Sequence, residues 1–439
     1  MAGRHRYPVV VARPLTSLRT AEILAVGSEM LTPFRVDTNS LFLTEQLNDL
    51  GLDIIGKSVV SDAAGLLEAA LRLALSRADV VVTTGGLGPT DDDLTRDGIA
   101  ATIGCAMHED AEVLRAIEAR FARRGRVMAA INRRQAQVPD GATPLDNPNG
   151  TAPGLWVPHG NAVLVALPGP PREMKPMWTT HVRPRLAALA GTRHLRRRTV
   201  FMTGRGESDI DAVAAPIYGA WAQQTPAITT SILAHPGQVE LHLVAQGDDT
   251  AVLDAALDGA VAQIVSALGP IIFSTTGDAL EVVVGRGLQD ASATIAVAES
   301  CTGGLLLGRL TDVPGSSAWV VGGVVAYDNR VKVDTLGVEA ETLSTHGAVS
   351  VPVASAMARG VRARLGSSIG VGITGIAGPG GGTEEKPVGM VVIAVDGPGD
   401  RHVVRTSHFP GDRAMVRQFS VQRALDLVRR ALMGADYND

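Results

Sequence analysis

The sequence predicts an α/β protein with two helix-covered, largely parallel sheets joined by a small α+β domain. Hydrophobic residues make up 45% of the 439 residues but aromatics only 3%, which indicates aliphatic cores. The 49 glycines suit tight strand-to-helix turns. Strand-like and helix-like patterns alternate in the first and last thirds of the chain, which is typical of parallel sheets.

In the first third, β-branched and aliphatic runs alternate with apolar residues at three- and four-residue steps. One helix should follow Asn39, and the next should begin behind the candidate cap Asp62. Strands are expected at 21–26, 52–60, 79–84 and 162–167, with further helices at 93–103 and 110–124. We interpret residues 1–19, which carry four arginines, as a disordered tail, with a targeting leader as the alternative.

The remaining two thirds of the chain show the same strand-like and helix-like patterns. They occur first in a small central unit and then in a larger C-terminal body. The central unit should contain strands at 199–203 and 239–245 and helices at 208–218 and 251–268. In the C-terminal body we expect helices at 280–288, at 350–365 and from 412 onward, and strands at 294–298, 320–327, 369–374, 388–395 and 402–409.

The net charge and the cysteine content indicate which partners and which cellular compartment the sequence favours. The net charge of −5 predicts no bulk attraction to nucleic acid or to an anionic membrane, and the basic run at 193–198 is interpreted as a solvated face. No apolar run was expected to reach the roughly 20 residues that span a bilayer. Cys105 and Cys301 do not suggest a disulfide framework, which favours a reduced, cytoplasmic setting.

The C-terminal body has glycine, serine or threonine after nearly every predicted strand. Such loops let backbone amides face an anion, although glycines also serve in plain turns. Four such loops in one domain favour a ligand site. They are AESCTGG (298–304), TDVPGSS (311–317), TGIAGPGGG (374–382) and FPGDR (409–413).

A similar loop, TTGGLGPTDDDLT (83–95), follows a hydrophobic strand near the N-terminus. Its glycines allow a phosphate to approach the backbone, and Asp92 and Asp93 offer hard oxygen ligands for Mg²⁺ or a similar ion. Glu29, after the first strand, would add a carboxylate at the same sheet edge. Acids in a first helical turn also simply complement the helix dipole, and for Asp91 that interpretation is preferred.

The C-terminal strings, together with GGVVAYDN (322–329), HGAVS (346–350) and EEKPVG (384–389), resemble the nicotinamide-nucleotide amidase domain of the CinA family. The resemblance covers about 277–432 and implies a domain over 277–439. It implies a serine nucleophile at Ser317, with Tyr327 and Lys332 beside it, and no cofactor. It also implies substrate contacts from Thr374, Arg413, Gly375 and Gly303.

The chemistry suits amide hydrolysis, because a neutral, partly desolvated lysine can deprotonate a serine. One straight strand would separate Ser317 from Tyr327 by roughly 30 Å. The sequence therefore predicts a sharp turn at Gly322-Gly323. Cys301, expected near a helix N-terminus, is a rival nucleophile, and Ser317 is preferred.

The N-terminal loop, with GSEML (27–31), DTNS (37–40), NRRQA (132–136), GTAPGL (150–155) and LPGPPREM (167–174), resembles the CinA N-terminal domain over about 20–178. That domain is similar in fold to molybdopterin-binding proteins and is associated with metal-dependent ADP-ribose pyrophosphatase activity. By analogy, Glu29, Asp92 and Asp93 would hold the divalent metal, and Asn39, Gly85, Gly86 and Gly88 would line the nucleotide site. One departure is visible, since Thr32-Pro33-Phe34-Arg35 replaces the usual small-residue turn.

The resemblance further implies a KH-like domain at 179–255, a linker or helix at 256–276, and a homodimer. The loop at 203–207 lacks the GxxG clamp that grips RNA, so nucleic acid is not expected as a partner. The leading hypothesis is a bifunctional enzyme that hydrolyses nicotinamide mononucleotide to nicotinate mononucleotide and ammonia and also cleaves ADP-ribose. The alternative is a non-catalytic nucleotide- or pterin-binding partner in competence or recombination.

Overall fold

The computed structural model describes residues 18–398 and 401–434 and divides the chain into two compact units. One unit comprises residues 1–196 and 246–251, and the other comprises 197–245 and 252–439. The tail expected at 1–19 lies outside the described residues except for its last two. Of these, Leu18 is buried in a hydrophobic core and its amide donates to the carbonyl of Leu189, so the tail prediction was wrong there.

The first unit is built on a six-stranded sheet of order β2-β1-β3-β8-β7-β6. The first four strands in this order are parallel, and β7 and β6 are antiparallel additions. The strands are β1 (Thr20–Val26), β2 (Asp53–Val60), β3 (Val80–Thr84), β6 (Thr143–Leu145), β7 (Gly154–His159) and β8 (Ala162–Leu167). A separate hairpin pairs β4 (Met107–Glu109) with β5 (Gln137–Pro139).

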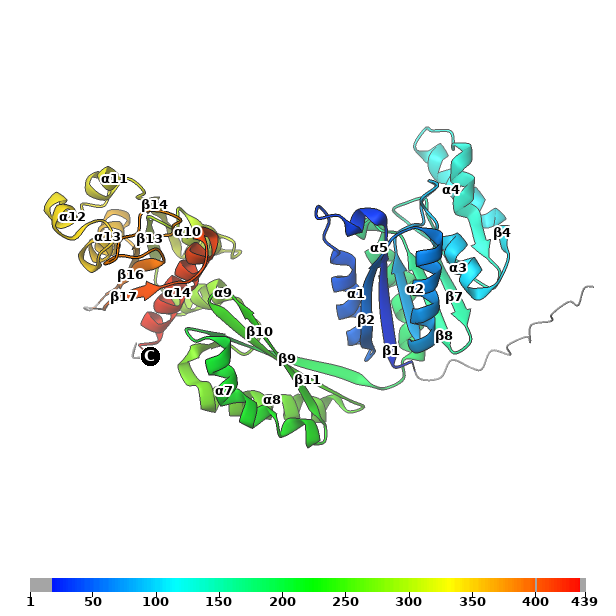
Figure 1. Ribbon diagram of the computed structural model, residues 1–439, viewed down its shortest axis with the longest axis horizontal. Coiled ribbons are helices and arrows are strands. Elements are labelled where there is room, and N and C mark those ends of the chain that lie inside the picture. The colour runs from blue at the N-terminus through cyan, green and yellow to red at the C-terminus, as the bar shows by residue number, and fades with distance from the viewer. Residues whose placement is uncertain (1–17, 399–400, 435–439) are drawn as a thin grey trace, which may run out of the picture. The chain divides into compact units, whose positions relative to one another are not determined.

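Helices cover both faces of this sheet, as Figure 1 shows for α1 and α2. Two clusters of buried, mainly aliphatic side chains fill the space between the sheet and these helices, one on each face of the sheet. The helices are α1 (Thr38–Asp49), α2 (Ala64–Arg77), α3 (Thr95–Ile103), α4 (Ala111–Arg123), α5 (Pro171–Met177) and α6 (Arg183–Leu189). Trp178, Val182 and Leu186 belong to the first unit's core, so this unit extends past the boundary expected at 178.

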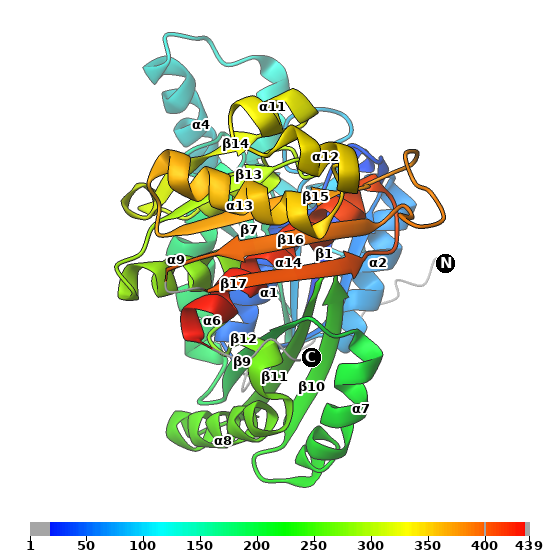
Figure 2. The same ribbon diagram turned by 90° about the vertical axis from the view of Figure 1, so that its left-hand side faces the viewer.

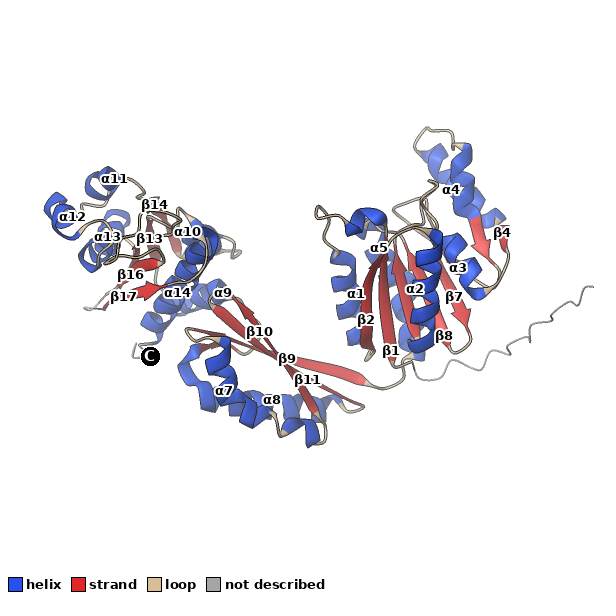
Figure 3. Ribbon diagram, viewed as in Figure 1, coloured by secondary structure: helices blue, strands red, loops and turns tan. Residues whose placement is uncertain are grey.

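The second unit begins with a four-stranded sheet of order β10-β11-β9-β12, covered by α7 and α8 (Figure 3). These elements are β9 (His194–Thr203), α7 (Glu207–Tyr218), β10 (Ile228–His235), β11 (Gln238–Gly247), α8 (Thr250–Leu268) and β12 (Ile272–Ser274). Because α8 runs through residue 255, the domain boundary predicted there was wrong. The basic run also lies within β9 rather than on a plain solvated face, and Arg198 pairs with Asp254 and Asp258 of α8.

Among the described residues, the segment Thr250–Ile271 is long and apolar enough to span a bilayer by length and composition. This corrects the expectation that no such segment exists. The helix packs one face on the four-stranded sheet through Leu253, Leu257 and Ile264, which are fully or almost fully buried. The burial of these residues anchors the helix on the sheet, while 28% of its apolar window is buried.

The rest of the second unit is a five-stranded sheet of order β14-β13-β15-β16-β17 (Figure 2). The first three strands are parallel, and the last two run antiparallel to their neighbours. They are β13 (Ile295–Glu299), β14 (Val320–Val325), β15 (Ile369–Gly375), β16 (Met390–Asp396) and β17 (His402–His408). The helices are α9 (Leu280–Asp290), α10 (Leu305–Thr311), α11 (Asn329–Asp334), α12 (Ala340–His346), α13 (Val351–Leu365) and α14 (Arg413–Met433).

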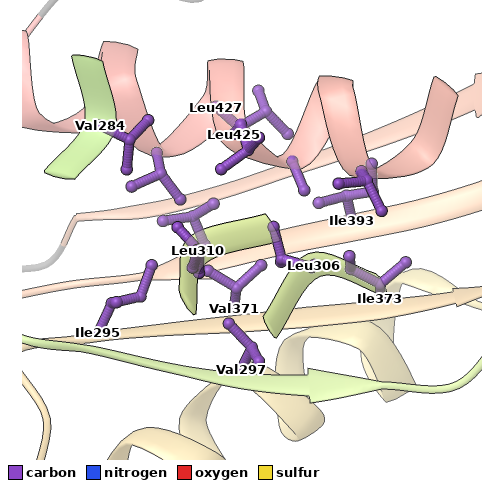
Figure 4. Close-up of a cluster of buried hydrophobic side chains, with 14 of the residues drawn as sticks. Val284, Ile295, Val297, Leu306, Leu310, Val371, Ile373, Ile393, Leu425 and Leu427 are labelled. Atoms are coloured by element: carbon purple, nitrogen blue, oxygen red, sulfur yellow. The ribbon is translucent and has the colours of Figure 1, made fainter. Parts of the chain in front are cut away.

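The main core of this part lies between the five-stranded sheet and α9, α10 and α14. Figure 4 shows Leu425 and Leu427 of α14 in one cluster with Val371 and Ile373 of the sheet. Helix α13 covers the opposite face with a smaller cluster. Burial on both faces explains why β13 and β15 read as continuous hydrophobic runs.

Candidate functional site

A candidate site lies where the parallel strands β13, β14 and β15 end. Strands β14 and β15 flank β13 on opposite sides, so the loops after β13 and β15 leave the sheet at a topological switch point. Open α/β sheets bind ligands at such points. Thr374 and Gly375 end β15, and Tyr327 follows β14 by two residues.

The loop after β13 is folded around a buried carboxylate. Glu299 is almost fully buried, and its carboxylate accepts hydrogen bonds from the amides of Gly304, Leu306 and Leu307. Gly303 and Gly304 both have positive φ, at 60° and 96°, which non-glycine residues rarely adopt. Glu299 thus caps α10 and fixes the AESCTGG loop at the strand end.

Lys332 is the most unusual side chain of this site. It is 1% exposed, and its Nζ donates to the carbonyls of Ala326 at 2.8 Å and Tyr327 at 3.2 Å. Burial lowers the pKa of Lys332, while nearby Asp328 and Cys301 oppose the shift. Burial makes this ammonium easier to deprotonate than a surface lysine, although its two carbonyl acceptors favour the charged form.

Tyr327 and Arg413 meet across the same edge. The guanidinium of Arg413 donates to the Tyr327 hydroxyl at 3.1 Å and to the carbonyl of Gly378 at 3.0 Å. Asp412 caps α14 by accepting from the amide of Met415, so Arg413 occupies the first position of that helix. Helix start, guanidinium and phenol together favour an anionic group at this edge.

Cys301 lies close enough to these groups for their charges to act on its thiol. Burial raises the pKa of Cys301 to about 12; the charge of Glu299 raises it further, and those of Arg413 and Arg417 lower it. The thiol is therefore protonated near neutral pH, whereas thiolate is the nucleophilic form. This argues against Cys301 as the nucleophile.

Ser317 does not join this group within one chain. It lies in a short 3-10 turn (Ser316–Ala318) that precedes β14, whereas Tyr327 and Lys332 follow that strand. The turn predicted at Gly322-Gly323 was wrong, because both glycines pair with Ala296 and Val297 inside the parallel ladder. The dipeptide accommodates an irregularity in register and a close approach to Val297 instead of reversing the chain.

The residues predicted to contact the substrate lie in the loop after β13, at the end of β15 and at the start of α14. Thr374 is buried and donates its hydroxyl to the carbonyl of Ala348, which holds it at the end of β15. Gly375 lies so close to Val391 that a Cβ would clash with it. The structure thus brings Gly303, Thr374, Gly375 and Arg413 to the strand-end region that contains Lys332.

The first unit has its own cavity of about 470 Å³, where β1, β3 and β8 end. Glu29, Asn39 and Gly85 line it, together with Gly169. The Asn39 amide nitrogen donates to the carbonyl of Gly169 at 2.7 Å, while its buried Oδ1 has no protein partner. Buried polar atoms are normally bonded, so this oxygen is available to a ligand.

The second half of the glycine loop is held away from that cavity. Asp93 accepts from the amide and hydroxyl of Thr90, and a Cβ on Gly88 would clash with it. A Cβ on Gly86 would clash with the Thr95 hydroxyl. Buried Arg96 donates to the carbonyls of Leu87 and Gly88, and burial lowers its pKa to about 10.

The three-carboxylate metal site is not formed. In the part of the chain that the structure describes, no group of three His, Cys, Asp or Glu side chains could hold a metal ion. Asp93 is turned toward Thr90, Asp92 is exposed, and Glu29 lies on the turn after β1. These three carboxylates therefore do not form a metal centre by themselves.

Two protein-family models match this chain, one in each of the two units. A family model described as the CinA C-terminal domain matches residues 277–432, and one described as a probable molybdopterin binding domain matches residues 22–188. A CinA-like protein from Acidobacterium capsulatum is 46% identical over 417 residues, which are 94% of this chain and 100% of that protein. The chain belongs to the CinA family.

Other relatives extend the comparison. A CinA-like protein from Solibacter usitatus is 45% identical and covers 94% of this chain and 98% of its own length. Among solved structures, a competence/damage inducible protein from Agrobacterium tumefaciens is 40% identical, with a TM-score of 0.34. That match covers 35% of this CinA-family chain and 93% of the other.

The structure of this CinA-family protein adds one residue that the motifs missed. Arg417 donates to the carbonyl of Thr302 at 2.8 Å, while its Nε and the Thr302 hydroxyl are buried without protein partners. Arg413 and Arg417 are four residues apart, so they share one face of α14. Two arginines in the first two turns of a helix oppose the preference of the helix dipole for acidic residues there, and that signal could have singled out Arg417 as a candidate site residue.

Proposed function

We propose that the C-terminal site hydrolyses the carboxamide of nicotinamide mononucleotide, giving nicotinate mononucleotide and ammonia. The observation that carries this proposal is Lys332, which is buried and held by carbonyls beside Tyr327 and Arg413. Burial lowers the pKa of Lys332, which favours the neutral form that a general base requires. A module that only binds nucleotides has no need of such a group.

In the proposed reaction, neutral Lys332 takes the proton of a serine hydroxyl as the serine oxygen attacks the carboxamide carbon. Ser317, the serine expected in this role, precedes β14 and does not reach Lys332 within one chain. The tetrahedral intermediate collapses, the carbon–nitrogen bond breaks, and Lys332 returns the proton to the departing ammonia. Water then attacks the seryl ester with Lys332 again taking its proton, which passes to the serine oxygen. The carboxylate leaves, so one water is consumed for each ammonia released.

The charges of the site support a phosphorylated substrate. Arg413 occupies the first position of α14, and Arg417 lies one turn later on the same face, so two guanidinium groups can meet an anion there. Incubation of the full chain with nicotinamide mononucleotide, with ammonia and nicotinate mononucleotide both measured, tests the proposal. Absence of ammonia would leave the alternative, a nucleotide-binding partner in competence or recombination.

Replacing Cys301 with Ala is expected to leave ammonia release within about threefold of the wild-type rate, because a protonated buried thiol supplies no nucleophile. Stability should fall by about 1 kcal/mol. Steady-state kinetics on the variant, with Cys105→Ala as the matched control, checks this. Complete loss of turnover in a folded Cys301→Ala protein would transfer the nucleophile's role to Cys301.

For the first unit we propose a second activity, cleavage of ADP-ribose with its pyrophosphate bound near Gly85. The unpartnered Oδ1 of Asn39 and the glycine loop at the cavity support a nucleotide ligand there. Magnesium commonly binds through one or two carboxylates plus substrate phosphates, so we propose that any metal arrives with the nucleotide. Loss of cleavage in EDTA would be expected.

Asn39→Ala is expected to weaken ADP-ribose binding about tenfold, because the variant loses both the ligand acceptor and the bond that fixes Gly169. Titration calorimetry with and without Mg²⁺ measures the change. Asn161→Ala, in an exposed turn of the same unit, is the control. Equal affinities in the two variants would place the nucleotide elsewhere.

A further inference from the structure

A second cavity of the first unit lies apart from the strand-end cavity that Asn39 lines. Its volume is about 850 Å³, which is in the range of small-molecule sites. Helix α4, labelled in Figure 1, forms one wall, and residues 144–153, which run from β6 to the start of β7, form the other. Among the described residues, none lines both cavities. Neither proposed activity uses this second cavity.

Helix α4 turns a regular stripe of side chains toward the cavity. Its members recur at three- and four-residue steps, and all of them line the cavity: Val113, Ala116, Ile117, Arg120 and Arg124. Of the described residues of α4, only Ile117 is buried. A helix face with this spacing ordinarily packs on a core, whereas this one borders an open space with arginines at its C-terminal end.

The opposite wall is a loop folded around the buried side chain of Asn147. The amide nitrogen of Asn147 donates to the Glu173 carboxylate at 2.9 Å. Its amide oxygen accepts from the backbone of Gly150 at 2.8 Å, where an added Cβ would clash with Glu173. Arg120 joins the two walls by donating to the carbonyls of Pro148 and Gly150. The cavity is therefore already formed without a ligand, as small-molecule sites usually are.

Three guanidinium groups, those of Arg120, Arg123 and Arg124, line this cavity. In the part of the chain that the structure describes, none of them is hydrogen-bonded to or ion-paired with a carboxylate. Burial lowers the pKa of Arg120, the charge of Asp146 opposes the shift, and the charges of Arg123 and Arg124 lower it further. The three cations therefore repel one another, and a bound anion would relieve that repulsion.

We propose that this cavity binds a small phosphate ester that carries a flat apolar ring. The planar guanidinium groups of Arg123 and Arg124 match the geometry of phosphate oxygens. Apolar side chains line both walls, with Val113 and Ile117 on the helix and Leu145 on the loop, so a ring fits between them. The concave shape favours a small molecule over a nucleic acid strand, and the net charge of −5 gives no bulk attraction for polyanions.

Calorimetric titration of the full chain with phenyl phosphate and with inorganic phosphate tests both parts of the ligand. Phenyl phosphate should bind more tightly, because its ring meets the apolar walls. The Arg123→Ala, Arg124→Ala double variant should bind it about tenfold more weakly or worse. The matched control, Arg115→Ala, Arg126→Ala, removes the same charge from positions that do not line the cavity and should bind normally. Equal loss in the two variants, or equal affinity for the two probes, would overturn the proposal.

A variant that fills the cavity tests its position without changing charge. Ala116 lines the cavity, so Ala116→Trp should abolish binding of phenyl phosphate. Ala122→Trp is the control, because Ala122 is also an exposed residue of α4 but does not line the cavity. Unchanged affinity in Ala116→Trp would place the ligand elsewhere and overturn the proposal.

Arginine labelling locates the bound phosphate independently of enzyme activity. Phenyl phosphate should protect Arg123 and Arg124 from phenylglyoxal, measured by mass spectrometry, and should leave the exposed Arg126 reactive. The protection should persist in Asn39→Ala, so failure of the proposed ADP-ribose cleavage would leave this site untouched. Loss of protection in Asn39→Ala, or protection by an oligoribonucleotide but not by phenyl phosphate, would overturn the proposal.

Discussion

Lys332→Met is expected to lower the rate of ammonia release from nicotinamide mononucleotide by about 10²–10⁴-fold, which is the usual contribution of a general base. Methionine has nearly the volume of lysine and remains buried, so the loss should lie in kcat and not in folding. Kinetics on the full chain measure it. Lys57→Met, an exposed lysine of the first unit, is the control and should leave the rate unchanged.

The pH profile provides an independent readout of the same residue. Lys332 acts as a base only when neutral, so kcat/KM should rise with pH through the pKa of Lys332 and then level off. Because burial lowers that pKa, the rise should end below the range of an ordinary lysine. A rate that is flat across the neutral range and only climbs at strongly alkaline pH would contradict the assignment.

Asp426→Asn is expected to destabilise α14 by about 3–5 kcal/mol, because it leaves buried arginine charge uncompensated. The carboxylate of Asp426 is fully buried and accepts from Arg429 at 2.7 Å and from Arg430 at 2.9 Å. Both arginines are almost fully buried as well. Since α14 also carries Arg413, substrate affinity should fall along with stability.

The two compact units make a single global unfolding curve ambiguous, so hydrogen exchange of peptides from residues 413–433 is the appropriate measurement. Asp290→Asn, at the exposed end of α9, is the matched control and should change local stability by less than about 0.5 kcal/mol. A loss under about 1 kcal/mol for Asp426→Asn would show that the arginine charges are relieved by other groups.

The strands buried on both faces were predictable because their signal is local. The strand at 162–167 was predicted with the bounds that the structure shows, and β13 and β15 were within one residue. Half-exposed or short elements were not recognised. Among them are β10, whose outward residues break the hydrophobic run, and the seven-residue α10, whose first amides donate to the Glu299 carboxylate.

The sequence also predicted ligand sites at the strand-end loops, but it misplaced some side chains. Asp93 was expected to face a metal, yet its contact with Thr90 only three residues away prevails. Arg417 escaped notice because its role depends on contact with Thr302, far away in the chain. Side-chain direction depends on such competing contacts, which periodicity does not encode.

By itself the sequence determined the α/β class, the family and the residue types that amide chemistry would use, because these follow from local patterns and motif spacing. The tertiary structure alone decided where those residues lie. Gly322 and Gly323 are compatible with either a turn or a strand, and only pairing with β13 selected the strand. That pairing separates Ser317 from Lys332 along one chain, since an extended strand cannot return to its own beginning.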